Sequence, residues 1–253
     1  MSESGVELDE ALVPVRLISL ENAPSEFAAS VTRSTNTQNR IDARNFVALD
    51  GEQERIRTEL LVEGIEYEFR QGDTEPKDLK RFGLLEATLA QACSQTTVDL
   101  AVQAKREIGK LWEDIASPPY KVLFNPSVSG SEIWSKVQTL RTLEVAIESE
   151  KSDRTEKQQQ ICIHGNRLIA HLALKSLAEN KPENSDTALP EEAHAELIRD
   201  VVDQVSNIVS ERYGESYLAS LFKNLQKCRE IAELVSTVDP YQLVEPRLDL
   251  PLS

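Results

Sequence analysis

The sequence contains few cysteines, few glycines and few aromatic residues. Its 253 positions include 3 cysteines, 9 glycines and 5% aromatic residues. An all-β fold with many tight turns needs more glycine and more aromatic residues than this, and we expect a different fold class. The cysteines, Cys93, Cys162 and Cys228, are odd in number and form no Cys-x-x-Cys pair. That pattern is typical of a reduced intracellular compartment and does not predict a zinc site.

Long apolar runs and a basic leader are also missing. No apolar run approaches the roughly 18 residues that a membrane-spanning helix needs. The first ten residues are acidic and lack the basic and apolar regions of a secretory signal peptide. We therefore expect a cytoplasmic protein that makes no membrane contact, with residues 1–12 as a disordered acidic leader.

Basic residues are in deficit. The chain has 43 acidic residues against 28 basic ones, which gives a formal net charge of −15. Broad, non-specific binding to nucleic acid needs clustered lysine and arginine, and this charge argues against it. A small local basic site remains compatible with the composition.

Residues 13–77 are predicted to form a small β-α-α-β element with two strands. Val13–Leu20 and Ile65–Arg70 both alternate apolar and polar residues, and the second alternates more regularly. Two short strands make only a small sheet. We therefore expect a missing N-terminal region or a partner protein to supply further strands.

Two helices are predicted between these strands. Ala23–Thr32 forms the first. Asp50 is a suitable N-cap for the second, Gln53 occupies the capping-box position, and Gly64 is placed to end the helix. The apolar face of this second helix consists of Ile56, Leu60 and Leu61.

Residues 78–235 are predicted to form a helical body, because the apolar period changes to that of a helix and stays so. Pro118-Pro119 interrupts the pattern, and Lys121–Asn125 is expected to be a connecting segment. Residues 180–189 form a linker, and Tyr217–Leu234 is the last helix. Residues 236–253 form a proline-containing tail. The predicted fold class is α+β, mostly α, with a small α/β element packed on a predominantly helical body.

The sequence offers no catalytic constellation, no metal-ligand set and no cofactor motif. His164 and His171 lie two helical turns apart, and no ligand residue stands between them to share a metal. Arg167 and His171 resemble the Arg…His pair of the helical HEPN ribonucleases, but their spacing is shorter than in that family. The alternative is a structural pair on one helix of the body. We therefore predict no catalytic residue, and an enzymatic activity is less expected than a binding role.

Val31–Asp50 is predicted to be a loop rich in amide and hydroxyl side chains, between one predicted helix and a capped second helix. The overlapping stretch Phe27–Ile41 contains two arginines and no acidic residue. Arginine binds phosphate, and amides can read base edges. A ligand site is predicted at Arg33, Asn36, Gln38, Asn39 and Arg40. Two alternatives stay open: binding of a peptide strand, and an internal contact of these side chains with Arg70 and Tyr67.

Four stretches of the sequence resemble one protein family, the bacterial abortive infection phage resistance (AIPR) family. They are T-R-S-T-N-T-Q-N-R-I from Thr32, F-V-A-L-D-G-E-Q-E-R-I from Phe46, I-E-Y-E-F-R from Ile65 and, more loosely, K-V-L-F-N from Lys121. The family's longer members carry a further N-terminal region with an Asn-Gly-x-Gln-Thr-like stretch that this chain lacks. By resemblance the chain corresponds to the C-terminal part of the family.

The resemblance implies a component of bacterial defence against phage. Two functions of different class remain open. In the first, the chain is a non-catalytic recognition or interaction module whose helical body binds a protein partner. In the second, it is part of a nucleic-acid-processing effector whose nucleotide site is the segment Arg33–Arg40. The absence of a catalytic constellation and the acidic charge favour the first.

Overall fold

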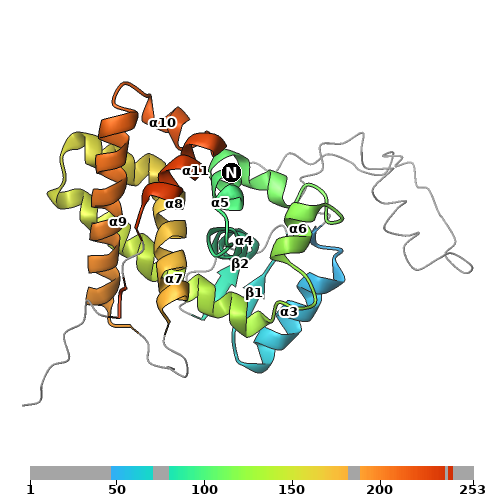
Figure 1. Cartoon of the computed structure of the whole chain (residues 1–253). Helices are drawn as coiled ribbons and strands as arrows, with labels where there is room; N and C mark the ends of the chain where they lie inside the picture. Colours follow the sequence, from blue (N-terminus) through green and yellow to red (C-terminus); the bar gives the residue numbers. More distant parts are fainter. Residues whose placement is uncertain (1–46, 71–79, 182–188, 237–238, 242–253) are drawn as a thin grey trace, which may run out of the picture. The chain divides into compact units, whose positions relative to one another are not determined.

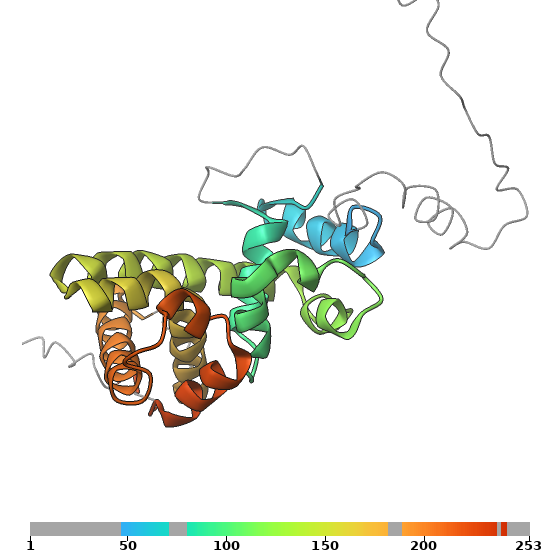
Figure 2. The same ribbon diagram turned by 90° about the horizontal axis from the view of Figure 1, so that it is seen from above.

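The computed structural model describes residues 47–70, 80–181, 189–236 and 239–241 (Figures 1 and 2). All of them belong to the second of two compact units, which runs from Asp42 to Ser253. Helices dominate this described part, and its strands form one two-stranded sheet. The predicted fold class, α+β and mostly α, is confirmed. The predicted strand Val13–Leu20 and helix Ala23–Thr32 lie outside the described residues.

Helix α3 (Gly51–Val62) begins and ends where the sequence predicts. The Asp50 carboxylate accepts a hydrogen bond from the Glu52 amide at 3.3 Å, which caps the first turn. At the other end Gly64 has a φ of 73°, and the amides of Gly64 and Ile65 donate back to the carbonyls of Leu61 and Leu60. This is a Schellman motif, which needs the left-handed conformation that glycine adopts without strain. Leu61 was predicted on the apolar face, but it is exposed, because the face that packs inward consists of Gln53, Ile56 and Leu60.

The sheet pairs β1 (Glu66–Glu68) with β2 (Arg81–Gly83) in parallel. Tyr67 lies opposite Phe82, and their ring centroids are 4.8 Å apart. The predicted alternation of β1 is confirmed: Ile65, Tyr67 and Phe69 are buried. The prediction of uninterrupted helix from Asp78 is wrong at β2. Its three residues are too few to show a strand period, and their extended form depends on pairing with β1.

The helical body packs against α3 and the sheet: α7 contacts α3, and α4 contacts β2. Helices α7, α8 and α9 contact one another, and α4 packs on both α7 and α8 (Figures 1 and 2). The α-helices of the body are α4 (Leu84–Cys93), α5 (Asp99–Glu107), α6 (Pro118–Leu123), α7 (Gly130–Glu150), α8 (Glu156–Asn180), α9 (Glu191–Arg212), α10 (Leu218–Leu221) and α11 (Leu225–Leu234). Two 3₁₀ segments, η1 (Ile108–Leu111) and η2 (Lys151–Asp153), extend α5 and α7.

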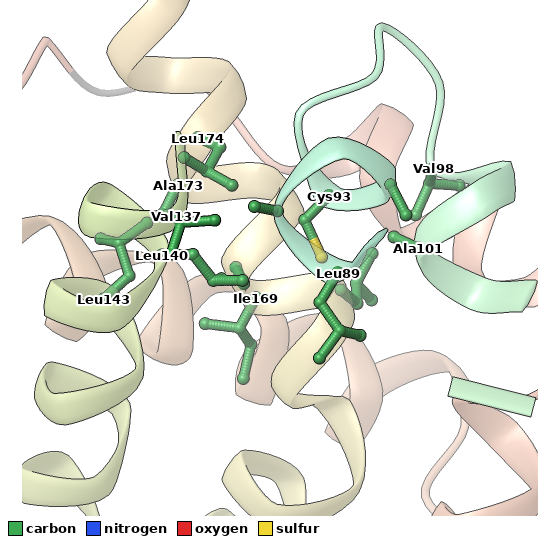
Figure 3. Packing of buried hydrophobic residues seen from close by; sticks show 14 of the residues in the cluster. Leu89, Cys93, Val98, Ala101, Val137, Leu140, Leu143, Ile169, Ala173 and Leu174 are labelled. Carbon is green, nitrogen blue, oxygen red and sulfur yellow. The ribbon is translucent and has the colours of Figure 1, made fainter. Parts of the chain in front are cut away.

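A continuous apolar core lies between these helices. Leu89 and Cys93 of α4 face Val137 and Leu140 of α7 and Ile169 of α8 (Figure 3). Every one of these side chains is at least 90% buried. Burial of apolar surface of this kind is the main favourable contribution to the free energy of folding.

Glycine at position 165 lets α8 approach the turn after α10. A Cβ atom at Gly165 would lie 2.9 Å from two ring atoms of Phe222, which is closer than packed carbon atoms come. Phe222 is 2% exposed, so its ring has little room to move away. The absence of a side chain at Gly165 is therefore a packing requirement.

An ion-pair cluster ties the C-terminal end of α7 to α9. Arg154 donates to the Glu150 carboxylate at 2.7 Å and also pairs with Asp203 of α9. Arg199, one turn away on α9, donates to the other oxygen of Glu150 at 3.3 Å. The Arg154 and Glu150 side chains are only 11% exposed, so water screens this cluster less than it screens surface pairs.

Two local predictions in the body are corrected. Lys121–Asn125 was expected to be a connecting segment, but Lys121–Leu123 belong to α6. Pro118 begins that helix at the first helical position, where a missing amide hydrogen costs nothing. Tyr217–Leu234 was expected to be one helix, but it is divided into α10 and α11. The Asn224 side chain accepts from the Lys227 amide at 3.0 Å and starts α11 afresh.

Within the described part of the chain, none of the helices combines the length and the apolar character needed to cross a bilayer.

Candidate functional site

The five residues predicted to bind a ligand, Arg33, Asn36, Gln38, Asn39 and Arg40, lie outside the described residues. The described chain starts shortly after them at Val47, whose side chain is fully buried. The Asp50 amide then donates to the Val47 carbonyl at 3.0 Å, which closes a turn before α3. The structure therefore shows how the chain is anchored on the C-terminal side of this segment.

A chain of four hydrogen-bonded side chains lies next to this anchor. The Tyr67 hydroxyl donates to Gln53 Oε1 at 2.5 Å, and Gln53 Nε2 donates to the Tyr120 hydroxyl at 2.8 Å. The Tyr120 hydroxyl in turn donates to Asp50 Oδ2. The donors all point in one direction, from the sheet through α3 and α6 to the carboxylate of Asp50.

Burial decides the chemistry of this network. Gln53, Tyr67 and Tyr120 are 0%, 3% and 2% exposed, so three of its four side chains are out of contact with solvent. Burial, and next the hydrogen bond to Asp50, raise the pKa of Tyr120. This phenol therefore stays neutral at physiological pH. A neutral, buried and hydrogen-bonded tyrosine holds its neighbours in place and does not present a nucleophile or a base to a substrate.

Arg55, two residues after Gln53 on α3, forms a second network. Its guanidinium donates to the Val128 carbonyl at 2.8 Å, to the Asn125 carbonyl at 3.2 Å and to Glu59 Oε1 at 2.5 Å. The other oxygen of Glu59 accepts from the Gly130 amide at 2.8 Å, at the start of α7. The hydrogen bond from Gly130, and next that from Arg55, lower the pKa of Glu59. Helix α3 is thus bound to the chain between α6 and α7 by charge-assisted hydrogen bonds.

Together the two networks join three segments that are far apart in the sequence. Phe46–Ile56 provides Asp50, Gln53 and Arg55, and Ile65–Arg70 provides Tyr67. Lys121–Asn125 provides the carbonyl of Asn125, and Tyr120 directly precedes it. These are the segments that carry the family resemblance. Their shared role in this structure is a framework that fixes α3, β1 and the start of α7 relative to one another.

Sequence reasoning missed the main residues of this framework. Gln53 was predicted to complete a capping box, but its side chain turns inward to Tyr67 and Tyr120. Tyr120 was not singled out at all. The available signal was its position at the start of α6 beside the K-V-L-F-N stretch, but Gln53 and Tyr120 are 67 positions apart. Spacing along the chain does not reveal a contact of that kind.

Arg167 and His171 do not converge on one reaction centre. Arg167 forms an ion pair with Glu144 of α7, and His171 Nδ1 lies 3.0 Å from the Cys93 carbonyl of α4. His171 is 2% exposed, and burial lowers its pKa. This geometry favours the interpretation as structural residues of the helical body. Among the described residues, no three or more His, Cys, Asp and Glu side chains are grouped to hold a metal ion.

Comparison with known proteins gives one match. The profile of a protein family described as "AIPR protein" matches residues 2–239, which is most of the chain. No curated protein and no solved structure matches it.

Proposed function

Because the chain belongs to the AIPR family, and membership implies a role in abortive infection against phage, we propose that it acts in this defence as a non-catalytic recognition module. The module binds a protein partner. Its recognition element is the polar segment Arg33–Arg40, and the helical body is the scaffold that carries this segment.

One observation supports the module over an enzyme. Gln53 and Tyr67, which lie in the stretches that resemble the family, and Tyr120, which directly precedes another, are buried and joined by hydrogen bonds through Gln53. In an active site, residues of such a motif contact substrate and keep a reactive group accessible. Here they hold three elements together, and the chain from Val47 to Asp50 is fixed to that framework. In this proposal, the buried residues of these stretches hold the chain that follows the polar segment Arg33–Arg40, and they do not react with a substrate.

The chemistry of the polar segment suits recognition of a polar or acidic surface. Arg33 and Arg40 provide charge, and Asn36, Gln38 and Asn39 provide amides that both donate and accept hydrogen bonds. Arginine is enriched where protein interfaces carry most of their binding energy.

The test is a phage challenge of bacteria that express the protein with its genomic neighbours. The double variant Arg33→Ala/Arg40→Ala should lose protection, so that plaque numbers rise to those on cells without the protein. Arg212→Ala is the control, because Arg212 is exposed on α9 and far from the segment in sequence. Melting curves of the purified variants are the second readout, because a double variant that loses protection but melts like the parent has lost recognition and not folding.

The same preparations separate the module from the alternative, a nucleic-acid-processing effector. The parent protein is incubated with phage DNA and with RNA, and labelled nucleotides are titrated against it. If the parent protein cleaves nucleic acid and a single-residue variant does not, the effector is the correct function and the module is not. The same conclusion would follow from nucleotide binding that Arg40→Ala weakens by about 1–3 kcal/mol, the contribution of a charge-assisted hydrogen bond. Full protection by the double variant would contradict the role of the segment in either function.

A further inference from the structure

A basic cavity lies among α5, η1, α6 and the turn between α10 and α11. It has a volume of about 450 Å³ and is lined by Gln103, Arg106, Glu107, Lys110, Pro119 and Lys223. This volume falls within the range of roughly 300–1,000 Å³ in which small molecules bind. The lining residues come from four different elements, so the fold brings them together.

The charge of the lining is opposite to that of the protein. Three cations and one carboxylate face the cavity, in a chain with a formal net charge of −15. Lys110 pairs with Glu113 at 2.6 Å. Within the described ranges, neither Arg106 nor Lys223 has a carboxylate partner, although most arginines there have one. Although acidic residues are abundant in this protein, these two cations at one cavity form no ion pair with a carboxylate of the described residues.

A further cation, Lys105 of α5, lies close enough to Lys223 for their charges to interact. Lys105 donates to the Ile163 carbonyl at 3.0 Å and to Asn166 Oδ1 at 2.8 Å, and both acceptors are neutral. Burial, and next the charges of Arg167 and Lys223, lower the pKa of Lys105 to about 8. Burial, and next Lys105 and Lys223, also lower the pKa of His164. Like charges therefore repel one another here, and an anion in the cavity would relieve that repulsion.

We propose that this cavity binds the phosphate group of a nucleotide-sized sugar phosphate, with Arg106, Lys110 and Lys223 as the phosphate ligands. Cations that approach from three elements surround an anion with several oxygens better than they match a single carboxylate. Glu107 would repel a second phosphate placed beside it. Its carboxylate instead accepts hydrogen bonds from hydroxyl groups, which the sugar supplies. The lining residues are distinct from Arg33–Arg40, and the proposal does not depend on the proposed function.

The experiment titrates the full chain with three probes, which are ribose 5-phosphate, AMP and pyrophosphate, by calorimetry in buffer of moderate ionic strength. At least one of the first two should bind. Arg106→Ala and Lys223→Ala should each weaken that binding by about 10–100-fold, the effect of losing one hydrogen bond to a charged group. Both residues are exposed, so the variants should melt like the parent.

Two further variants make the test specific. Lys157→Ala removes an exposed lysine of α8 for which no carboxylate partner is seen in the described part, and it controls for the loss of one positive charge. It should leave binding unchanged. Glu107→Gln removes the repulsion but keeps the shape. It should strengthen pyrophosphate binding and should not strengthen ribose 5-phosphate binding to the same degree.

The outcomes that overturn the proposal are equally direct. The site is wrong if none of the probes binds at millimolar concentration, or if Lys157→Ala weakens binding as much as Lys223→Ala does. Binding of pyrophosphate alone would refute the sugar phosphate as the ligand.

Discussion

Replacing Gln53 by alanine should destabilise the protein more than any exposed substitution of the same type. The Gln53 side chain is fully buried and makes two hydrogen bonds, one from Tyr67 and one to Tyr120. Each bond contributes about 0.5–1.5 kcal/mol, and truncation of the side chain adds the cost of a cavity. We expect a loss of about 2–4 kcal/mol in the free energy of unfolding. For a chain of this size that corresponds to a decrease in Tm of roughly 4–16 °C.

Two comparisons separate the causes. Gln53→Met keeps most of the volume but makes neither hydrogen bond, so it should retain about 1–3 kcal/mol of the loss. Gln160→Ala is the matched exposed control on α8 and should stay within about 0.5 kcal/mol of the parent. Both are measured by urea denaturation followed by circular dichroism.

A double-mutant cycle tests the network directly. Gln53→Met and Tyr120→Phe remove the two ends of one hydrogen bond, and their coupling energy should be about 0.5–3 kcal/mol. A Gln53→Met variant as stable as the parent would refute the reasoning, and so would strictly additive losses in the cycle. Either result would mean that the hydrogen bonds of Gln53 add no stability beyond the packing of the side chains.

Three further predictions concern the helical body. Gly165→Ala should cost about 1–3 kcal/mol, because the new Cβ atom overlaps the Phe222 ring, and Phe222→Leu should recover part of this loss in urea denaturation; an unchanged midpoint for Gly165→Ala would contradict the packing. Burial lowers the pKa of His171, so below the ordinary value of about 6.5 the unfolded chain binds more protons than the folded chain, and stability falls as the pH falls. The difference in urea midpoint between about pH 7.5 and about pH 5.5 should therefore shrink in His171→Asn, and an identical difference would argue against a titrating His171. Burial raises the pKa of Cys93 and of Cys228 to about 12, so both thiols should react slowly with a disulfide reagent at about pH 8 and rapidly in denaturant; fast labelling of the native protein would show that they are accessible.

The features that could be predicted from the sequence are those that depend on neighbouring residues. Asp50 and Gly64 delimit α3 as expected, because capping is decided within one helical turn. The alternation of apolar and polar residues along Ile65–Arg70 likewise predicts which of its side chains are buried. The resemblance to the family was also visible in short stretches, and the match across residues 2–239 confirms it.

The features that could not be predicted depend on contacts between distant residues. The strand β2 exists because β1 pairs with it, and its three residues carry no period of their own. The partners of Gln53 and the neighbours of Lys223 come from elements whose approach is set by packing of the core. No spacing rule relates such residues before the fold is known.

Helix α7 restricts how this protein can change in length during evolution. Its first residue, Gly130, is bonded to Glu59, and its last, Glu150, is bonded to Arg154 and Arg199. The 21 residues from Gly130 to Glu150 span about 31 Å. Inserting or deleting one residue would turn the far end by about 100° and shift it by about 1.5 Å, which would carry Glu150 out of reach of Arg199 on α9. Relatives are therefore expected to differ in length in the connections between helices and not within α7, because even a change of about seven residues, two full turns, restores the phase but moves the far end by about 10 Å.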